Sequence, residues 1–222
     1  MRPRKKEFPD MRTSLVLTVM ADDRPGIVET IASRVLATGA NWEESRMARL
    51  AGKFAGLLLI SVAADRADEL VASLAALRDD GLTIVVERAA HAGTPGTLAP
   101  DTPGTLAPGT SGTLTSGTLA PGTLAPGTLA PRSHFRLALV GNDRPGIVRD
   151  ISRVLARSGV NIDELETGTS SAPMTGETLF HASARVRVPP SVSLDALRGE
   201  LEALAGELMV DLVLDDVAQV DG

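Results

Sequence analysis

The hexapeptide Asp-Arg-Pro-Gly-Ile-Val occurs twice in the chain, at residues 23–28 and again at residues 143–148. Outward from these two copies, the flanking sequences align at a constant offset of 120 residues. The matched positions include Ile31 with Ile151, Gly39 with Gly159, Asn41 with Asn161, and Glu44 with Glu164. The 222-residue chain therefore contains the same small domain twice.

Each copy shows the pattern of a strand, a helix, two strands, a helix and a final strand. An alternating apolar run precedes the hexapeptide, and Ile27, Ile31 and Val35 then recur at helical spacing until Gly39 ends the helix. The order βαββαβ predicts the ferredoxin-like arrangement of an α+β protein, an antiparallel sheet with both helices on one face. We place the two domains at residues 11–92 and 132–222.

The remaining segments differ sharply in composition. Residues 1–10 form a basic N-terminal arm, and residues 93–131 repeat Gly-Thr-Leu-Ala-Pro five times. Proline blocks helix and sheet pairing, and one leucine per repeat buries too little apolar surface to order the segment. We predict a disordered, low-complexity linker between the domains, with a passive tether favoured over a docking tract.

Charge and composition exclude several functions. The net charge is −6, which is a poor fit for direct nucleic-acid binding because such binding neutralises phosphates. Four Phe and one Trp are too few to build two RNA-stacking platforms. The sequence has no cysteine, no apolar run long enough to span a bilayer, and no domain large enough for a Rossmann enzyme. We expect a cytoplasmic protein without nucleic-acid or membrane contacts.

The doubled turn is the candidate binding site. Proline suits the first position of a helix, so the two helices should begin at Pro25 and Pro145. The backbone amides of Gly26 and Ile27, and of Gly146 and Ile147, would then be unpaired donors able to accept a small carboxylate. A tight turn without a ligand explains the same residues.

Polar side chains near this turn could complete the site. Asn41 and Asn161 should enter the second strand of each domain close to the turn, where an amide could both donate and accept, or could only help to end the helix beside the glycine. Asp23 and Asp143 could accept from the ammonium of an amino acid, or could only hold the turn. We find no metal-ligand spacing, no cofactor motif and no nucleophile beside a base, so we expect no enzyme.

One strand is apolar on both faces. In the stretch Phe-Ala-Gly-Leu-Leu-Leu-Ile-Ser-Val at residues 54–62, Leu57 and Leu59 point away from Leu58 and Ile60. A strand with one solvated face should alternate. We therefore expect the helix-free face of the first domain to be covered, either by the second domain or by a second chain in a homodimer.

The motifs together resemble a known family. The hexapeptide followed by Gly-Ala-Asn-Trp at 39–42 or Gly-Val-Asn-Ile at 159–162 resembles the ACT domain, a regulatory amino-acid-binding module. Residues 41–50 and 52–56 are similar to the tandem-ACT glycine cleavage system transcriptional repressor family, as are residues 171–174 and 208–211 of the second domain. The resemblance covers both domains but not the arm or the linker.

This resemblance implies a non-enzymatic regulator that senses a small amino acid, glycine foremost. It also implies repression of the glycine cleavage enzymes through contact with a transcriptional activator protein. The ligand would lie between paired domains, touched by the first turn and by the asparagine after the first helix. The positions matching this pattern are Asp23, Gly26, Ile27, Asn41, Asp143, Gly146, Ile147 and Asn161. The alternative is an ACT-type protein-interaction module without a functional ligand site.

Overall fold

The computed structural model describes residues 12–89, 133–172 and 176–216. We refer to residues 12–89 as the first lobe and to the described residues from 133 onward as the second lobe. The basic arm predicted at residues 1–10 and the linker predicted at residues 93–131 lie outside the described residues.

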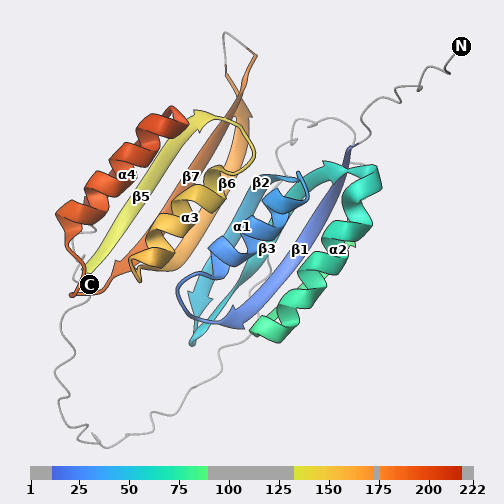
Figure 1. Cartoon of the computed structure of the whole chain (residues 1–222), viewed down its shortest axis with the longest axis horizontal. Coiled ribbons are helices and arrows are strands. Elements are labelled where there is room, and N and C mark those ends of the chain that lie inside the picture. The colour runs from blue at the N-terminus through green and yellow to red at the C-terminus, as the bar shows by residue number, and fades with distance from the viewer. Residues whose placement is uncertain (1–11, 90–132, 173–175, 217–222) are drawn as a thin grey trace, which may run out of the picture. The chain divides into compact units, whose positions relative to one another are not determined.

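Both lobes have the predicted βαββαβ order, so the ferredoxin-like fold is confirmed (Figure 1). The first lobe comprises β1 (Arg12–Asp22), α1 (Ile27–Ala37), β2 (Asn41–Leu50), β3 (Lys53–Ala63), α2 (Ala67–Ala75) and β4 (Leu82–Arg88). Short 3₁₀ turns, Ala64–Arg66 and Ala76–Asp80, flank α2. The second lobe comprises β5 (Ser133–Asn142), α3 (Ile147–Arg157), β6 (Asn161–Ser171), β7 (Thr178–Val188), α4 (Leu194–Leu208) and β8 (Val210–Asp216).

The first helix of each lobe begins later than predicted. Pro25 and Pro145 precede the helices, which start at Ile27 and Ile147. The physical reason is the glycine between them: Gly26 has a φ of 91° and Gly146 a φ of 100°, both in the left-handed region. A residue in that conformation cannot belong to a right-handed helix, so the hexapeptide forms a turn first and a helix afterwards.

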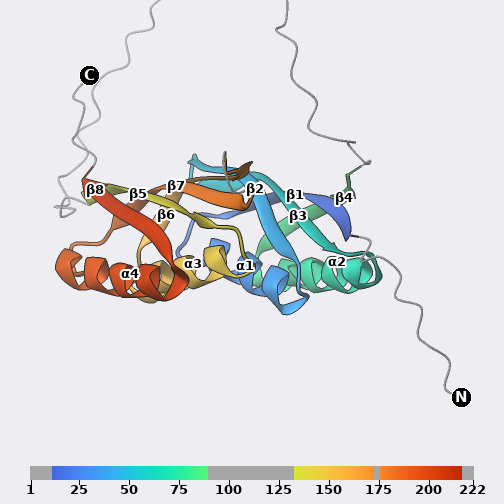
Figure 2. The ribbon, with the colours of Figure 1, turned by 90° about the horizontal axis from the view of Figure 1, so that it is seen from above.

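The eight strands form one sheet in the order β4-β1-β3-β2-β6-β7-β5-β8. The two lobes join edge to edge, because β2 pairs antiparallel with β6 from Ser45↔Thr167 to Ala48↔Glu164. All four helices cover the same face of the sheet (Figure 2), and α1 packs against α3 across the join. The buried apolar side chains of both lobes lie between the sheet and these helices and form one continuous core.

None of the helices of the described residues lies on the opposite face of the sheet. In β3, Leu58 and Ile60 are buried beneath the helices, whereas Leu57 on the outer face is 54% exposed. Thr18 pairs with Leu57 on one side and Val85 on the other, and Val85 is also exposed. The second lobe extends the sheet and does not cover this face, so the prediction that the second domain covers it is wrong. Cover by a second chain stays a prediction.

Candidate functional site

Two asparagine–aspartate contacts connect the lobes at the two ends of the α1–α3 pair. At the first junction, Asn161 Nδ2 donates to Asp23 Oδ1 over 2.8 Å. At the second junction, Asn41 Nδ2 donates to Asp143 Oδ2 over the same distance. Each asparagine therefore contacts the turn of the other lobe, not that of its own lobe as its sequence position had suggested.

The local fold brings the asparagine and aspartate side chains of each junction into contact. Each aspartate directly follows the first strand of its lobe, and a backbone hydrogen bond fixes its position. The N–H of Asp23 donates to the Gly52 carbonyl over 2.9 Å, and the N–H of Asp143 donates to the Thr178 carbonyl over 2.8 Å. Each asparagine opens a strand two residues after a left-handed glycine, Gly39 in the first lobe. The sheet join then brings the asparagine of one lobe to the turn of the other.

The glycines of the two turns also lie at the lobe interface. A Cβ added at Gly26 would lie 3.8 Å from Ala156 Cβ of α3, and one added at Gly146 would lie 3.4 Å from Leu36 Cδ2 of α1. Neither helix start has a side-chain cap. Ile27 and Ile147 are buried in the core, so only their backbone amides could meet a ligand.

A small cavity lies behind each junction, and the two are equivalent by the repeat. One is lined by Gly26, Ile27, Glu29 and Asn161, among others, and has a volume of about 10 Å³. The other is lined by Gly146, Ile147, Arg149 and Asn41, among others, and is also about 10 Å³. Such a volume holds about one water molecule. An amino acid could enter either site only by displacing the side chains around it.

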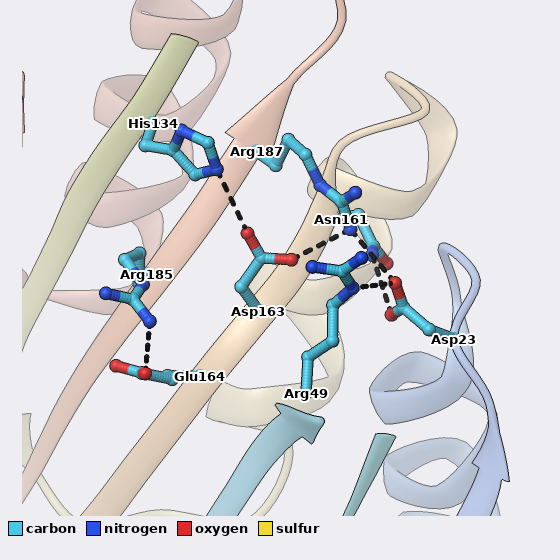
Figure 3. A network of polar contacts seen from close by, with 8 residues as sticks. All are labelled: Asp23, Arg49, His134, Asn161, Asp163, Glu164, Arg185 and Arg187. Atoms are coloured by element: carbon cyan, nitrogen blue, oxygen red, sulfur yellow. Dashed lines mark hydrogen bonds and ion pairs between the residues drawn. The ribbon is translucent and has the colours of Figure 1, made fainter. Parts of the chain in front are cut away.

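The first junction is a network of buried charges (Figure 3). Asp23 is 8% exposed, and its Oδ2 accepts from Arg49 Nε at 2.7 Å and from an Arg187 terminal nitrogen at 3.0 Å. The same Arg187 nitrogen donates to Asp163 Oδ1 at 2.8 Å. His134 Nε2 lies 3.4 Å from the other oxygen of Asp163. Both lobes thus contribute charges to one interlobe cluster.

This network holds Asp23 ionised. Burial by itself would raise the pKa of Asp23, but the hydrogen bonds from Asn161 and Arg187, together with the positive charges of Arg187 and Arg49, outweigh it and lower the pKa. The carboxylate form of Asp23 is therefore part of the folded structure.

An open hollow lies beside the first junction. It has a volume of about 270 Å³ and is lined by Asp23, Pro25, Gly159, Asn161, Arg187 and Pro189. Its polar lining belongs to the charge network just described.

The second junction lacks this network. Ser61 takes the place of Arg187, since Asn41 pairs with Ser61 across β2 and β3 just as Asn161 pairs with Arg187 across β6 and β7. The Ser61 hydroxyl is contacted by Arg12. Asp143 Oδ1 is buried and, within the described part of the chain, has no hydrogen-bond partner.

Sequence reasoning thus found both aspartates and both asparagines but missed Arg49, Asp163 and Arg187. The Arg187 side chain is only 14% exposed, although arginine side chains are mostly exposed in folded proteins. Arg187 lies opposite Asn161 in the β6–β7 pairing, and this position would have identified it. Finding it requires the strand register, which the sequence alone does not show.

The described residues contain neither a metal cluster nor a membrane-spanning helix. Among them, no group of three or more His, Cys, Asp or Glu side chains is placed to hold a metal ion. None of the helices in these ranges is both long enough and apolar enough to cross a membrane.

Comparison with known families agrees with this architecture. Models of the ACT domain match residues 13–87 and residues 136–206, one in each lobe and together more than half of the chain. The chain belongs to the ACT domain family. It is a tandem ACT protein, and the two junctions lie between its paired ACT domains.

Named relatives are matched over shorter stretches. The chain is 47% identical over 47 residues to the glycine cleavage system transcriptional repressor of Escherichia coli and, equally, to that of Shigella flexneri. The match covers 21% of this chain and spans only 25% of the length of either repressor.

Two solved structures are similar over nearly the whole chain. A protein of unknown function from Galdieria sulphuraria is 30% identical, covers 94% of this chain and 100% of its own, and has a TM-score of 0.38. A structure assigned provisionally as a glycine cleavage system transcriptional repressor is 19% identical over 94% of this chain and 99% of its own, with a TM-score of 0.35.

Proposed function

We propose that this tandem ACT protein senses a small amino acid, glycine foremost, between its two lobes. The observation that carries the proposal is the pair of interlobe Asn–Asp contacts. Each places a carboxylate and an amide from different lobes beside an uncapped helix start. A carboxylate accepts from an ammonium group, and free backbone N–H groups bind a carboxylate, so the groups gathered at the junctions are of the kinds that complement the two charges of a zwitterion.

The geometry also explains how binding could act as a signal. The junction groups already contact one another across the lobes at 2.8 Å, and the cavities behind them are of water size. A ligand must therefore replace or share an interlobe contact. Its binding would change how the lobes are held together, which a partner protein could detect.

Thermal unfolding with a panel of amino acids tests the sensing role. A ligand present at 100 times its Kd stabilises the folded protein by about 2.7 kcal/mol, so glycine at millimolar concentration should raise the Tm measurably. Alanine and serine are the size controls, and acetate and ethylamine test whether both charged groups are needed. An unchanged Tm with every amino acid would refute the sensing role.

We propose that the output is repression of the glycine cleavage enzymes through contact with a transcriptional activator protein in the cytoplasm, without enzymatic activity or direct contact with DNA. The net charge of −6 and the similarity to the Escherichia coli repressor support this proposal. Capture of a purified activator by the tagged chain, with and without glycine, tests it. Amounts of captured activator that do not change with glycine would refute the coupling.

A second candidate is favoured by a different observation. Met20, Leu57 and Val85 are each about half exposed on the helix-free face of the first lobe. An apolar patch of this kind typically marks a protein interface. The chain would then be an interaction module whose outer face pairs with that of a second copy. Leu57→Lys would convert such a dimer to a monomer, as measured by light scattering, whereas a native chain that is already monomeric would refute this alternative.

A further inference from the structure

The two junctions are equivalent by the repeat but not by their charges. At the first junction both oxygens of Asp23 are occupied, one by Asn161 and the other by Arg49 and Arg187. At the second junction Asn41 occupies one oxygen of Asp143, while the other oxygen is buried without a partner among the described residues. A buried carboxylate oxygen without a donor is costly, so Asp143 is the carboxylate with capacity for an ammonium group.

A second unsatisfied atom lies on the same segment of the second lobe. Arg149 is in the first turn of α3 and lines the cavity of the second junction together with Asn41 and Gly146. One of its terminal nitrogens donates to Asp150 Oδ1 over 2.8 Å, but its Nε is buried and has no partner in the described structure. A guanidinium N–H left unpaired is a strong donor for a carboxylate.

The first junction offers a donor but no free acceptor, because Arg187 Nε is likewise buried without a partner in the described structure, whereas both oxygens of Asp23 are occupied. An ammonium group near Asp23 would find no free acceptor oxygen and would lie close to the guanidinium groups of Arg49 and Arg187. The residue that corresponds to Arg149 is Glu29, so the first cavity is lined by one base, Arg24, and one acid. Among the described residues, the second cavity is lined by Arg144 and Arg149 without an acid, which favours a carboxylate there. The open hollow beside this junction does not change the conclusion, since Asp23 is the acidic residue in its lining.

We propose that the chain binds one amino acid, at the second junction only, with its ammonium group on Asp143 and its carboxylate on Arg149. The ion pairs of Asp23 and Asp163 with Arg49 and Arg187 at the first junction, which we call the latch, then keep the lobes paired while the second junction opens. The assignment rests on the proposed amino-acid sensing and adds which of the two equivalent sites performs it.

Calorimetric titration of glycine into the full chain tests the assignment. The native chain should bind one glycine. Asp143→Asn removes the acceptor charge, and Arg149→Gln removes the donor charge. Because hydrogen bonds to charged groups are the stronger ones, each variant should weaken the affinity by at least about tenfold. Glu29→Gln, the same kind of change at the corresponding position of the first lobe, should leave the affinity unchanged.

The outcomes separate the two levels of the proposal. Binding of two glycines per chain, or loss of affinity in Asn161→Ala with full affinity in Asp143→Asn, would overturn the assignment and leave the sensing role intact. A native chain that binds no amino acid would refute the sensing role itself. Circular dichroism of each variant confirms folding, and Arg149→Gln tests the site independently should Asp143→Asn not fold.

Discussion

Removing Arg187 should destabilise the protein strongly, because this one side chain neutralises two buried carboxylates. Asp23 and Asp163 are 8% and 7% exposed, and Arg187 contacts them at 3.0 and 2.8 Å. In Arg187→Met, Asp23 keeps Arg49, but of the basic groups that the structure describes Asp163 keeps only the more distant His134. Breaking a buried ion pair from one side costs about 3 to 5 kcal/mol. Since Asp23 stays compensated, we expect the lower end, about 3 kcal/mol.

The same strand supplies a matched control. Arg185 pairs with Glu164 on the outer face of the sheet, where the two side chains are 47% and 51% exposed (Figure 3). Arg185→Met should therefore cost less than about 1 kcal/mol. Adding Asp163→Asn to Arg187→Met removes the uncompensated charge and should recover part of the loss.

Urea unfolding followed by tryptophan fluorescence measures both variants. Trp42 is the single tryptophan of the chain and is buried at the lobe interface, where its Nε1 donates to Thr167 Oγ1 over 3.1 Å. Its emission should report on lobe separation as well as on unfolding. A free energy of unfolding reduced equally by Arg187→Met and Arg185→Met would refute the latch.

Three further predictions concern the pKa of Asp23, the backbone of two glycines and the hydrogen bond of Trp42. The folded-state pKa of Asp23 lies below its ordinary value of 3.8, so its contribution to stability is complete above pH 3.8 and is lost as the pH falls through the lowered pKa. In Asp23→Asn, the free energy of unfolding, measured by urea titration at several pH values, should therefore fall less steeply at acidic pH. Gly146→Ala should cost about 1–2 kcal/mol in urea unfolding because φ is 100° there, whereas Gly199→Ala, inside α4 with open space around it, should stabilise by about 0.5–1 kcal/mol. Trp42→Phe should lose about 1 kcal/mol by removing the hydrogen bond to Thr167, as measured by thermal unfolding.

The sequence was sufficient to predict the fold because the decisive signals are local. The repeated hexapeptide, the helical spacing of Ile27, Ile31 and Val35, and the helix-ending Gly39 all act within a few residues. The helix starts two residues after the proline that predicts its first position, because the left-handed conformation of the following glycine overrides the N1 preference of proline.

The candidate site could be predicted only in part. Asp23 and Asn161 were found because the repeat marks them, but their contact depends on β2 pairing with β6, which joins segments far apart in the chain. Arg187 could not be found by the offset of the repeat, because the hairpin between β6 and β7 is longer than that between β2 and β3. Its equivalent is Ser61, and only the strand register shows this.

The side-chain amide region of a ¹H–¹⁵N NMR spectrum tests sensing at the lobe junctions most directly. The chain has only three asparagines and one glutamine, so the Nδ2 signals of Asn41 and Asn161 can be assigned by substitution, with exposed Asn142 as the internal reference. Addition of glycine should shift the Asn41 signals and leave those of Asn142 in place. Asn41 and Asn161 signals that both stay unmoved at millimolar glycine would contradict the account.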